Sequence, residues 1–323
     1  MISYRPLLVF FILLYAKAFL LSQEQAVELG KVHWLRSYDE AVRIAEEQGK
    51  DILILFQEVP GCATCRNYGT EVLSHPLIVE AIENEFVPLC IFNNHKGEDE
   101  RILKKYNEPS WNNPVVRIVN TKGENIIQRV SGSYNEASLI LNMVIALSHA
   151  GRKIPQYLKL LEAEYTVDVK DQKTAYFSMY CFWSGEAYFG DKQGVIHSYP
   201  GFMNGKEVVK LNYDASRLNI NSLARSAAKE EFSLEKKVSK FRLDKDPQYY
   251  LKKSHYRFLA LSQIQRSRIN SAIHKGQDPS VYLSPTQLRV LDIIENDKII
   301  KDLKVLYDKE LNQSWMEMIR ILN

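Results

Sequence analysis

Short apolar runs and helical repeats alternate along residues 35–150. The runs DILILFQ, FVPLCIF and NPVVRIVN are brief and almost wholly apolar, which is the pattern of strands buried in a sheet. Around them, SYDEAVRIAEEQGK, HPLIVEAIENEF, DERILKKYN and NEASLILNMVIALSHA repeat apolar residues at helical spacing. This alternation predicts an α/β unit, with a central sheet covered by helices. After the turn at Lys122-Gly123, GENIIQRVSG predicts an edge strand.

A second unit of strands and helices follows residue 150, and the rest of the chain has a helical pattern. TAYFSMY and EVVKLNYD have strand patterns, CFWSGEAYFG indicates a turn that enters a helix, and RLNINSLARSAAKE indicates a helix capped by Asn221 or Ser222. Farther on, LSPTQLRVLDIIEN begins with a capping box of Ser284 and Gln287, and DKIIKDLKVLYDKEL has one apolar side. We expect these last helices to pack on the second unit.

The N-terminus has the pattern of a secretory signal peptide. Arg5 precedes an apolar run over residues 7–15, and Ala16-Lys17-Ala18 has the small residues of a cleavage site. The run is shorter than the roughly 20 residues that span a bilayer. We therefore expect cleavage after Ala18 and a periplasmic or secreted protein that meets the membrane only during export. A membrane anchor formed by an uncleaved N-terminus is the alternative.

These patterns divide the chain into four parts. They are a signal peptide (1–18), a first α/β unit (19–150), a second, α+β unit (151–265) and a C-terminal helical extension (266–323). A net charge of +3 over 323 residues gives no reason to expect a nucleic-acid partner. The sequence has neither a Gly-rich phosphate loop nor a His-based metal motif, so we expect no cofactor and no bound metal.

Two of the four cysteines form a Cys-x-x-Cys motif, Cys62 and Cys65, between the first strand and a helix. The motif alone fits a redox dithiol, half of a zinc site or a structural disulfide. Zinc needs about four ligands, and neither Cys90 nor Cys181 has a Cys-x-x-Cys partner. A bridge over so short a loop adds little stability. A redox pair is favoured, with Cys62 as the attacking thiol, because the N-terminus of a helix stabilises a thiolate.

The strand, the Cys-x-x-Cys at a helix start and the later WNNPVV resemble the thioredoxin superfamily over residues 35–150. This resemblance implies that Pro114 is a cis-proline that faces the dithiol and presents backbone to the substrate. More closely, VPGCATC, followed by SHPLIVEAIENEFVPLCIFNN and WNNPVVRIV, is similar to the VPGUxxT family of thioredoxin-like (seleno)proteins. In that family the position of Cys62 can carry selenocysteine, which implies that Cys62 attacks the substrate.

Residues 174–228 resemble peptide methionine sulfoxide reductase A. That family has a Gly-Cys-Phe-Trp motif whose cysteine is the nucleophile, and Cys181, Phe182 and Trp183 match it. The resemblance implies that Cys181 attacks the sulfoxide sulfur and that the two aromatic side chains bind the substrate's methyl group. The fold implied for the whole chain is a thioredoxin-like sandwich, an α+β reductase-like domain and C-terminal helices.

The same resemblance implies roles for residues outside this motif. Tyr199 in HSYPG matches a tyrosine that hydrogen-bonds the sulfoxide oxygen, and Glu207 in GKEVVKLNYD matches a proton donor. Glu186 matches a glutamate that is common just after the cysteine. The chain departs from the pattern at Tyr180, where the family has glycine, and at Lys206, where it has histidine.

Together the two resemblances imply an exported, thiol-dependent oxidoreductase. Cys181 is expected to reduce methionine sulfoxide in an oxidised protein or peptide and to become a sulfenic acid, which a thiol must clear. The Cys62/Cys65 dithiol of the same chain is expected to reduce Cys181, and an external thiol reductant to restore the dithiol. The alternative is a disulfide oxidoreductase whose degenerate second unit only binds a protein substrate.

Overall fold

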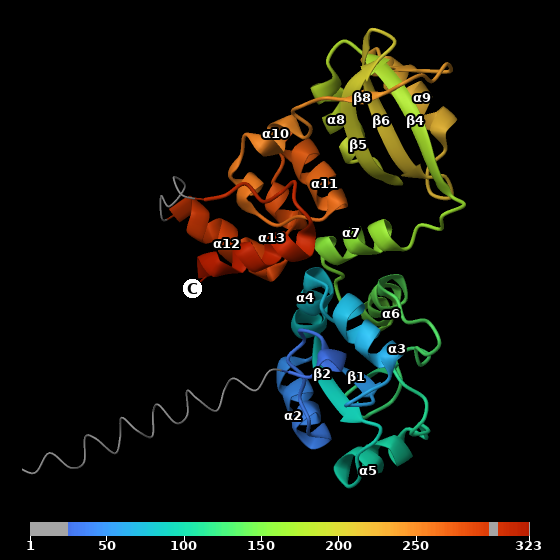
Figure 1. Cartoon of the computed structure of the whole chain (residues 1–323), viewed down its shortest axis with the longest axis vertical. Helices are drawn as coiled ribbons and strands as arrows, with labels where there is room; N and C mark the ends of the chain where they lie inside the picture. Colours follow the sequence, from blue (N-terminus) through green and yellow to red (C-terminus); the bar gives the residue numbers. More distant parts are fainter. Residues whose placement is uncertain (1–24, 297–302, 323) are drawn as a thin grey trace, which may run out of the picture.

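The structure, a computed structural model, describes residues 25–296 and 303–322. The expected signal peptide lies outside the described residues. Within the described ranges, no helix is both long enough and apolar enough to cross a membrane. Figure 1 shows two sheets toward opposite ends of the molecule, with a layer of helices between them.

The first unit is built on a three-stranded sheet in the order β2-β1-β3. β1 (Asp51–Gln57) pairs in parallel with β2 (Phe86–Phe92) and antiparallel with β3 (Val115–Val119). Every residue of β1 after Asp51 is buried, because helices cover both faces of the sheet. Around the sheet lie η1 (Val27–Leu29), α2 (Tyr38–Gln48), α3 (Ala63–Asn67), the π-helix η2 (Tyr68–Val72), α4 (Pro76–Glu85), α5 (Glu98–Lys105) and α6 (Glu136–His149).

Alternate residues of β1 enter two separate cores. Leu53 and Leu55 pack with residues of α4 and α6, whereas Ile52 and Ile54 pack with residues of α2 and α5. Successive side chains of a strand point to opposite faces, so the short apolar run serves both cores. Apart from the edge strand expected after Lys122-Gly123, the predicted strands and helices of this unit are confirmed, including the Ser37 cap of α2.

The edge strand predicted after the Lys122-Gly123 turn is not a continuous strand. This segment meets β3 at two isolated bridges, which involve Asn125 and Val130. Between the bridges, Arg129 turns to the buried carboxylate of Glu108, which it contacts at 2.8 Å. The ion pair joins residues far apart in the sequence, so the strand pattern gave no sign of it.

The second unit is an antiparallel sheet in the order β7-β4-β6-β5-β8. The pattern missed β5 because Pro200 and Gly201 lie inside it. Asn219 caps the following helix by accepting from the N–H groups of Asn221 and Ser222, which were the expected caps. The elements are β4 (Gln172–Met179), α8 (Phe182–Gly190), β5 (Val195–Met203), β6 (Lys206–Asp214), α9 (Ile220–Ala227), η3 (Ala228–Glu230), β7 (Ser233–Leu234) and β8 (Arg242–Leu243).

The layer of helices joins the two sheets (Figure 1). It contains α7 (Gln156–Tyr165), α10 (Tyr249–Lys252), η4 (His255–Phe258), α11 (Gln263–His274), η5 (Pro279–Tyr282), α12 (Pro285–Asn296), α13 (Leu311–Met318) and η7 (Ile319–Leu322). α11 packs on α8 of the second unit, but α12 and α13 contact α4 of the first. The expected packing of the last helices on the second unit alone is therefore wrong. The domain boundary expected at residue 265 falls inside α11.

A buried carboxylate of the first unit holds the last helices in place. Glu80 of α4 accepts hydrogen bonds from the backbone N–H (2.8 Å) and the hydroxyl (2.6 Å) of Thr286. The predicted capping box at the start of α12 is confirmed, since the N–H of Ser284 donates to the Gln287 side chain at 2.8 Å and Gln287 N–H donates back. The contact of Glu80 with Thr286, by contrast, could not be predicted from the local pattern of the tail.

The helix predicted from DKIIKDLKVLYDKEL is absent where the structure describes that segment. Residues 303–310 are extended or turn, and the N–H groups of Leu306 and Tyr307 donate to the carbonyl of Arg257. Leu306 is buried, so its apolar character reflects packing against η4 and not a helical face. The first residues of the segment lie outside the described ranges.

Candidate active sites

The Cys-x-x-Cys motif lies where β1 ends and α3 begins, as predicted. Cys62 is the N-cap residue of α3 and is exposed, whereas Cys65, in the first turn, has no exposed surface. The two sulfur atoms are 3.6 Å apart. Gln57, at the end of β1, donates to the carbonyl of Cys65 at 3.2 Å and so ties the helix to the sheet.

Gly61 is required at its position by space. A Cβ on this residue would collide with the carbonyl of Glu58 and lie 2.7 Å from the Cβ of Cys65. The N–H of Gly61 donates to the buried side chain of Glu28 at 2.9 Å, and the preceding Val59–Pro60 bond is cis. The backbone therefore passes directly over Cys65 and leaves Cys62 open to solvent.

The two thiols have different acidities. Hydrogen bonds lower the pKa of Cys62, chiefly the one from the backbone N–H of Cys65, with smaller contributions from the Cys65 thiol and from Thr64. Burial, followed by the hydrogen bond with Cys62, raises the pKa of Cys65 to about 12. At neutral pH the exposed thiol is the more readily ionised, which is the order that a nucleophile and a resolving thiol need.

The loop before β3 closes over the dithiol. The Asn113–Pro114 peptide bond is cis, as the resemblance implied, and Pro114 is buried. The Cys65 thiol donates to the side-chain oxygen of Asn113 at 2.7 Å. Trp111, two residues earlier, is 81% exposed. Pro114 was expected here from the family resemblance, but Asn113, the residue of this loop that bonds the buried thiol, was not.

Cys181 lies at the equivalent place in the second unit, between β4 and α8. It is the N-cap residue of α8 and is half-buried. The hydroxyl of Ser184 donates to its sulfur at 3.6 Å, and Tyr250 from α10 lies 3.4 Å from that hydroxyl. Glu207 of β6 accepts from the N–H of Phe182 at 2.9 Å. The structure therefore brings Glu207 to the start of the helix that Cys181 begins.

Aromatic rings form a stack beside Cys181. Trp183 stacks on Phe182 (centroids 5.6 Å apart) and on Tyr249 (4.0 Å), and its indole N–H donates to Asp244 at 3.1 Å. Tyr180, the bulky residue in place of the family's glycine, is 98% exposed. It points to solvent and does not crowd the cysteine.

Tyr199 is not at this site. Ser198, its neighbour in β5, donates to a carbonyl of α8, so Tyr199 points to the opposite face of the strand. Its ring packs on His197 at 4.1 Å, and His197 in turn faces Ser267 of α11. The expected role of Tyr199 beside Cys181 does not fit this geometry.

Three polar side chains near Cys181 were missed by the sequence argument. Ser184, Tyr250 and Asp244 reach the site or its aromatic stack from α8, from α10 and from the loop before α10. Only the spacing of Ser184, one helical turn after Cys181, gave a local signal.

Glu186, which the family resemblance had singled out, is fully buried. It accepts a hydrogen bond from the N–H of Gln248, and burial raises its pKa.

The two cysteine sites lie in separate parts of the molecule. In Figure 1, α3 and α8 are on opposite sides of α7. Cys62 and Cys181 begin these two helices, so with α7 between them they do not face each other in this structure, and the expected relay within one chain has no support here.

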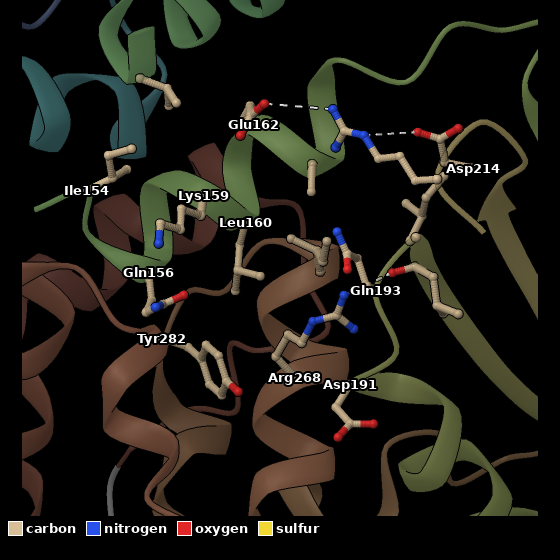
Figure 2. Close-up of a pocket in the computed structure, with 17 residues that line it drawn as sticks. Ile154, Gln156, Lys159, Leu160, Glu162, Asp191, Gln193, Asp214, Arg268 and Tyr282 are labelled. Atoms are coloured by element: carbon tan, nitrogen blue, oxygen red, sulfur yellow. Dashed lines mark hydrogen bonds and ion pairs between the residues drawn. The ribbon is translucent and has the colours of Figure 1, made fainter. Parts of the chain in front are cut away.

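A cavity of about 550 Å³ lies elsewhere, between α7, α11 and the loop after α8 (Figure 2). The two arginines that line the cavity already have protein partners. Arg268 donates to the carbonyls of Gly190, Lys192 and Val195, and Arg217 pairs with Asp214 and Glu162. None of the expected site residues lines this cavity.

Comparison with known proteins gives one family match, to a thioredoxin-like family over residues 33–121. A thioredoxin from Thermus thermophilus, known from a solution structure, is 22% identical, with a TM-score of 0.33, over 37% of this chain and 90% of its own. A DsbH oxidoreductase is 16% identical, with a TM-score of 0.32, over 41% of this chain and 94% of its own. No curated protein matches the chain.

Proposed function

Because residues 33–121 form a thioredoxin-like domain that holds a Cys-x-x-Cys pair, we propose that the protein is a thiol–disulfide oxidoreductase. One observation carries this proposal: the exposed thiol has a lowered pKa, and the buried thiol 3.6 Å away has a raised one. The similarity of the surrounding sequence to VPGUxxT-type proteins supports the same order of reaction.

The reaction uses the two thiols in turn. The Cys62 thiolate attacks a disulfide of an oxidised protein, which forms a mixed disulfide and releases one substrate thiolate. Cys65 then loses its proton and attacks the Cys62 sulfur, which releases the second substrate thiolate and leaves a Cys62–Cys65 disulfide. An external thiol reductant restores the dithiol. The cis-peptide loop at Pro114, with exposed Trp111, lies beside the pair and supplies the surface for the substrate chain.

A more specific proposal is that Cys181 reduces methionine sulfoxide. Its sulfur attacks the sulfoxide sulfur, the oxygen passes to Cys181 as a sulfenic acid, and methionine leaves. The support is the place of Cys181 at the start of α8, with Glu207 and the Ser184–Tyr250 hydroxyl pair around it. Since α7 lies between the two sites, the sulfenic acid is reduced by an external thiol or by the dithiol of another molecule.

The competing function is a second unit that only binds a protein substrate. It is favoured by one observation: Tyr199 faces away from Cys181. Under this proposal the exposed Tyr180 and the aromatic stack contact a polypeptide, and disulfide exchange is the only chemistry.

Paired assays on single variants separate these functions. Reduction of insulin disulfides is expected to disappear in Cys62→Ser and Cys65→Ser and to persist in Cys181→Ser. Turnover of a methionine sulfoxide peptide by the wild type, lost in Cys181→Ser and weakened in Glu207→Gln but not in the control Glu235→Gln, supports the reductase. Absence of sulfoxide turnover with intact insulin reduction supports the binding unit. Insulin reduction that survives Cys62→Ser contradicts the main proposal.

We also propose that the protein works outside the cytoplasm, where a reduced dithiol needs a dedicated donor. The support is the pattern of residues 1–18. Cell fractionation and N-terminal sequencing of the mature chain test it. A mature chain that starts after Ala18 agrees with export by cleavage, and an intact N-terminus in the membrane fraction favours the anchored alternative.

A further inference from the structure

Three potential metal ligands converge at the dithiol. The carboxylate of Glu58 and the thiols of Cys62 and Cys65 have donor atoms that all lie within 4.8 Å of one another. Over residues 25–296 and 303–322, no other three Cys, His, Asp or Glu side chains were found with ligand atoms so close together. Two thiols and a carboxylate form a donor set that suits Zn²⁺, which accepts sulfur and oxygen ligands together.

The sulfur positions already fit a tetrahedral metal. With metal–sulfur bonds of about 2.3 Å, two ligands at the tetrahedral angle are about 3.8 Å apart. The observed separation of the Cys62 and Cys65 sulfur atoms is 3.6 Å. The corresponding sulfur–oxygen separation is about 3.6 Å, with metal–oxygen bonds of about 2.1 Å. The Glu58 oxygen lies within 4.8 Å of both sulfur atoms, so this half-buried side chain needs to move by no more than about 1.2 Å.

The backbone that carries these ligands is held in place by protein contacts. Asn94 bonds both the N–H (3.3 Å) and the carbonyl (3.1 Å) of Val59, next to Glu58. Gly61 donates to Glu28 at 2.9 Å. Ligands on a backbone that is already held in place lose less conformational entropy on metal binding than ligands on a free loop.

We propose that the reduced Cys62/Cys65 dithiol and Glu58 form a binding site for a thiophilic divalent cation of the Zn²⁺ class. Binding forms two metal–sulfur bonds and one metal–oxygen bond, releases the protons that the two thiols still carry, up to two, and moves no electrons. The fourth position is left to water or a substrate group. In the oxidised protein the sulfur atoms are joined to each other and offer no thiolate, so the metal and the disulfide exclude one another.

The consequence is that the metal regulates the dithiol, and this part rests on the thiol–disulfide function proposed above. A bound cation blocks attack by Cys62 and protects the pair from oxidation. No metal was expected from the sequence, because the chain has neither a second Cys-x-x-Cys pair nor a His-based metal motif. Glu58 is four residues before Cys62, in the turn that follows β1.

Zinc titration of the full chain tests the site without any activity measurement. The reduced protein is titrated calorimetrically in two buffers of different protonation enthalpy, with the oxidised protein as reference. We expect one Zn²⁺ per reduced chain, release of between one and two protons, and no binding after oxidation. Glu58→Gln should weaken zinc binding at least about ten-fold, the scale on which even an outer partner weakens a metal site. Glu71→Gln, an exposed carboxylate in the adjacent η2, should bind as the wild type does.

Binding with equal affinity in Glu58→Gln, or no stoichiometric binding by the reduced wild type, overturns the proposal. The regulatory part is tested separately by measuring insulin reduction with and without zinc. Each rate is divided by the zinc-free rate of the same variant. Zinc binding without any insulin reduction leaves the metal site standing and defeats the proposed function. Insulin reduction that zinc does not inhibit in the wild type overturns the regulatory part.

Discussion

Selective alkylation of Cys62 over Cys65 follows from the different surroundings of the two thiols. The pKa of Cys62 lies below its ordinary value of 9.0, and the pKa of Cys65 is raised to about 12. Alkylating reagents react with the thiolate. Three pKa units or more between the two thiols make the Cys62 thiolate at least about 1,000 times more abundant at neutral pH.

Part of this advantage is offset, because a thiolate of higher pKa is the better nucleophile. With a Brønsted coefficient of about 0.5, three pKa units make the Cys65 thiolate about 30 times more reactive than the Cys62 thiolate. The net expectation is that Cys62 reacts at least about 30 times faster, before the burial of Cys65 is counted. The rate at Cys62 should rise with pH and level off above a midpoint that lies below 9.0.

The assay is brief treatment of the reduced, full-length chain with iodoacetamide at several pH values. Fragment ions of the peptide that follows Lys50 and ends at Arg66 assign the label to Cys62 or Cys65. The same chain unfolded in urea is the control, in which the two rates should become nearly equal. A ratio near one in the folded protein, or a Cys62 midpoint above 9.0, would show that the surroundings of the two thiols do not separate their acidities in this way.

Other substitutions test separate contacts. Gly61→Ala places a Cβ against Cys65 and should destabilise the protein by about 1–3 kcal/mol in urea unfolding, with slower insulin reduction; an unchanged midpoint contradicts the close approach. Glu80→Ala removes two hydrogen bonds to Thr286 and should cost at least about 2 kcal/mol and expose the tail to limited proteolysis; a protected tail argues against this anchor. Tyr250→Phe should slow any sulfoxide turnover about ten-fold or more without changing insulin reduction, measured as kcat for both substrates; equal sulfoxide rates remove its hydroxyl from the chemistry.

Most elements of the first unit could be predicted because each is marked by residues that lie within or next to it. The strands of the first sheet are short apolar runs, and the cap of α2 is set by Ser37 and its neighbours. The Cys-x-x-Cys at a helix start is likewise marked by the residues themselves, whereas the cis peptide before Pro114 was implied only by the resemblance to the thioredoxin superfamily. The chemistry of the cysteine pair could therefore be predicted before the fold was known.

Contacts between distant segments could not be predicted in this way. Glu80 and Thr286 are separated by 206 positions, and no repeat or cap signals that one binds the other. Tyr199 matched a family motif, but whether a strand residue faces Cys181 depends on which face of β5 packs on α8. A strand that contains proline and glycine hides its register from a pattern of alternation.

Trapping of a mixed disulfide shows which cysteine attacks the substrate. Reduced Cys65→Ser, which lacks the resolving thiol, is mixed with a disulfide-linked peptide, and the adduct is mapped by mass spectrometry; the double variant that also carries Cys62→Ser is the control. The account predicts one peptide per chain, attached to Cys62, and none in the control. An adduct on Cys181 or Cys90 instead, or no adduct on Cys62, would contradict the claim that Cys62 is the attacking thiol of a disulfide oxidoreductase.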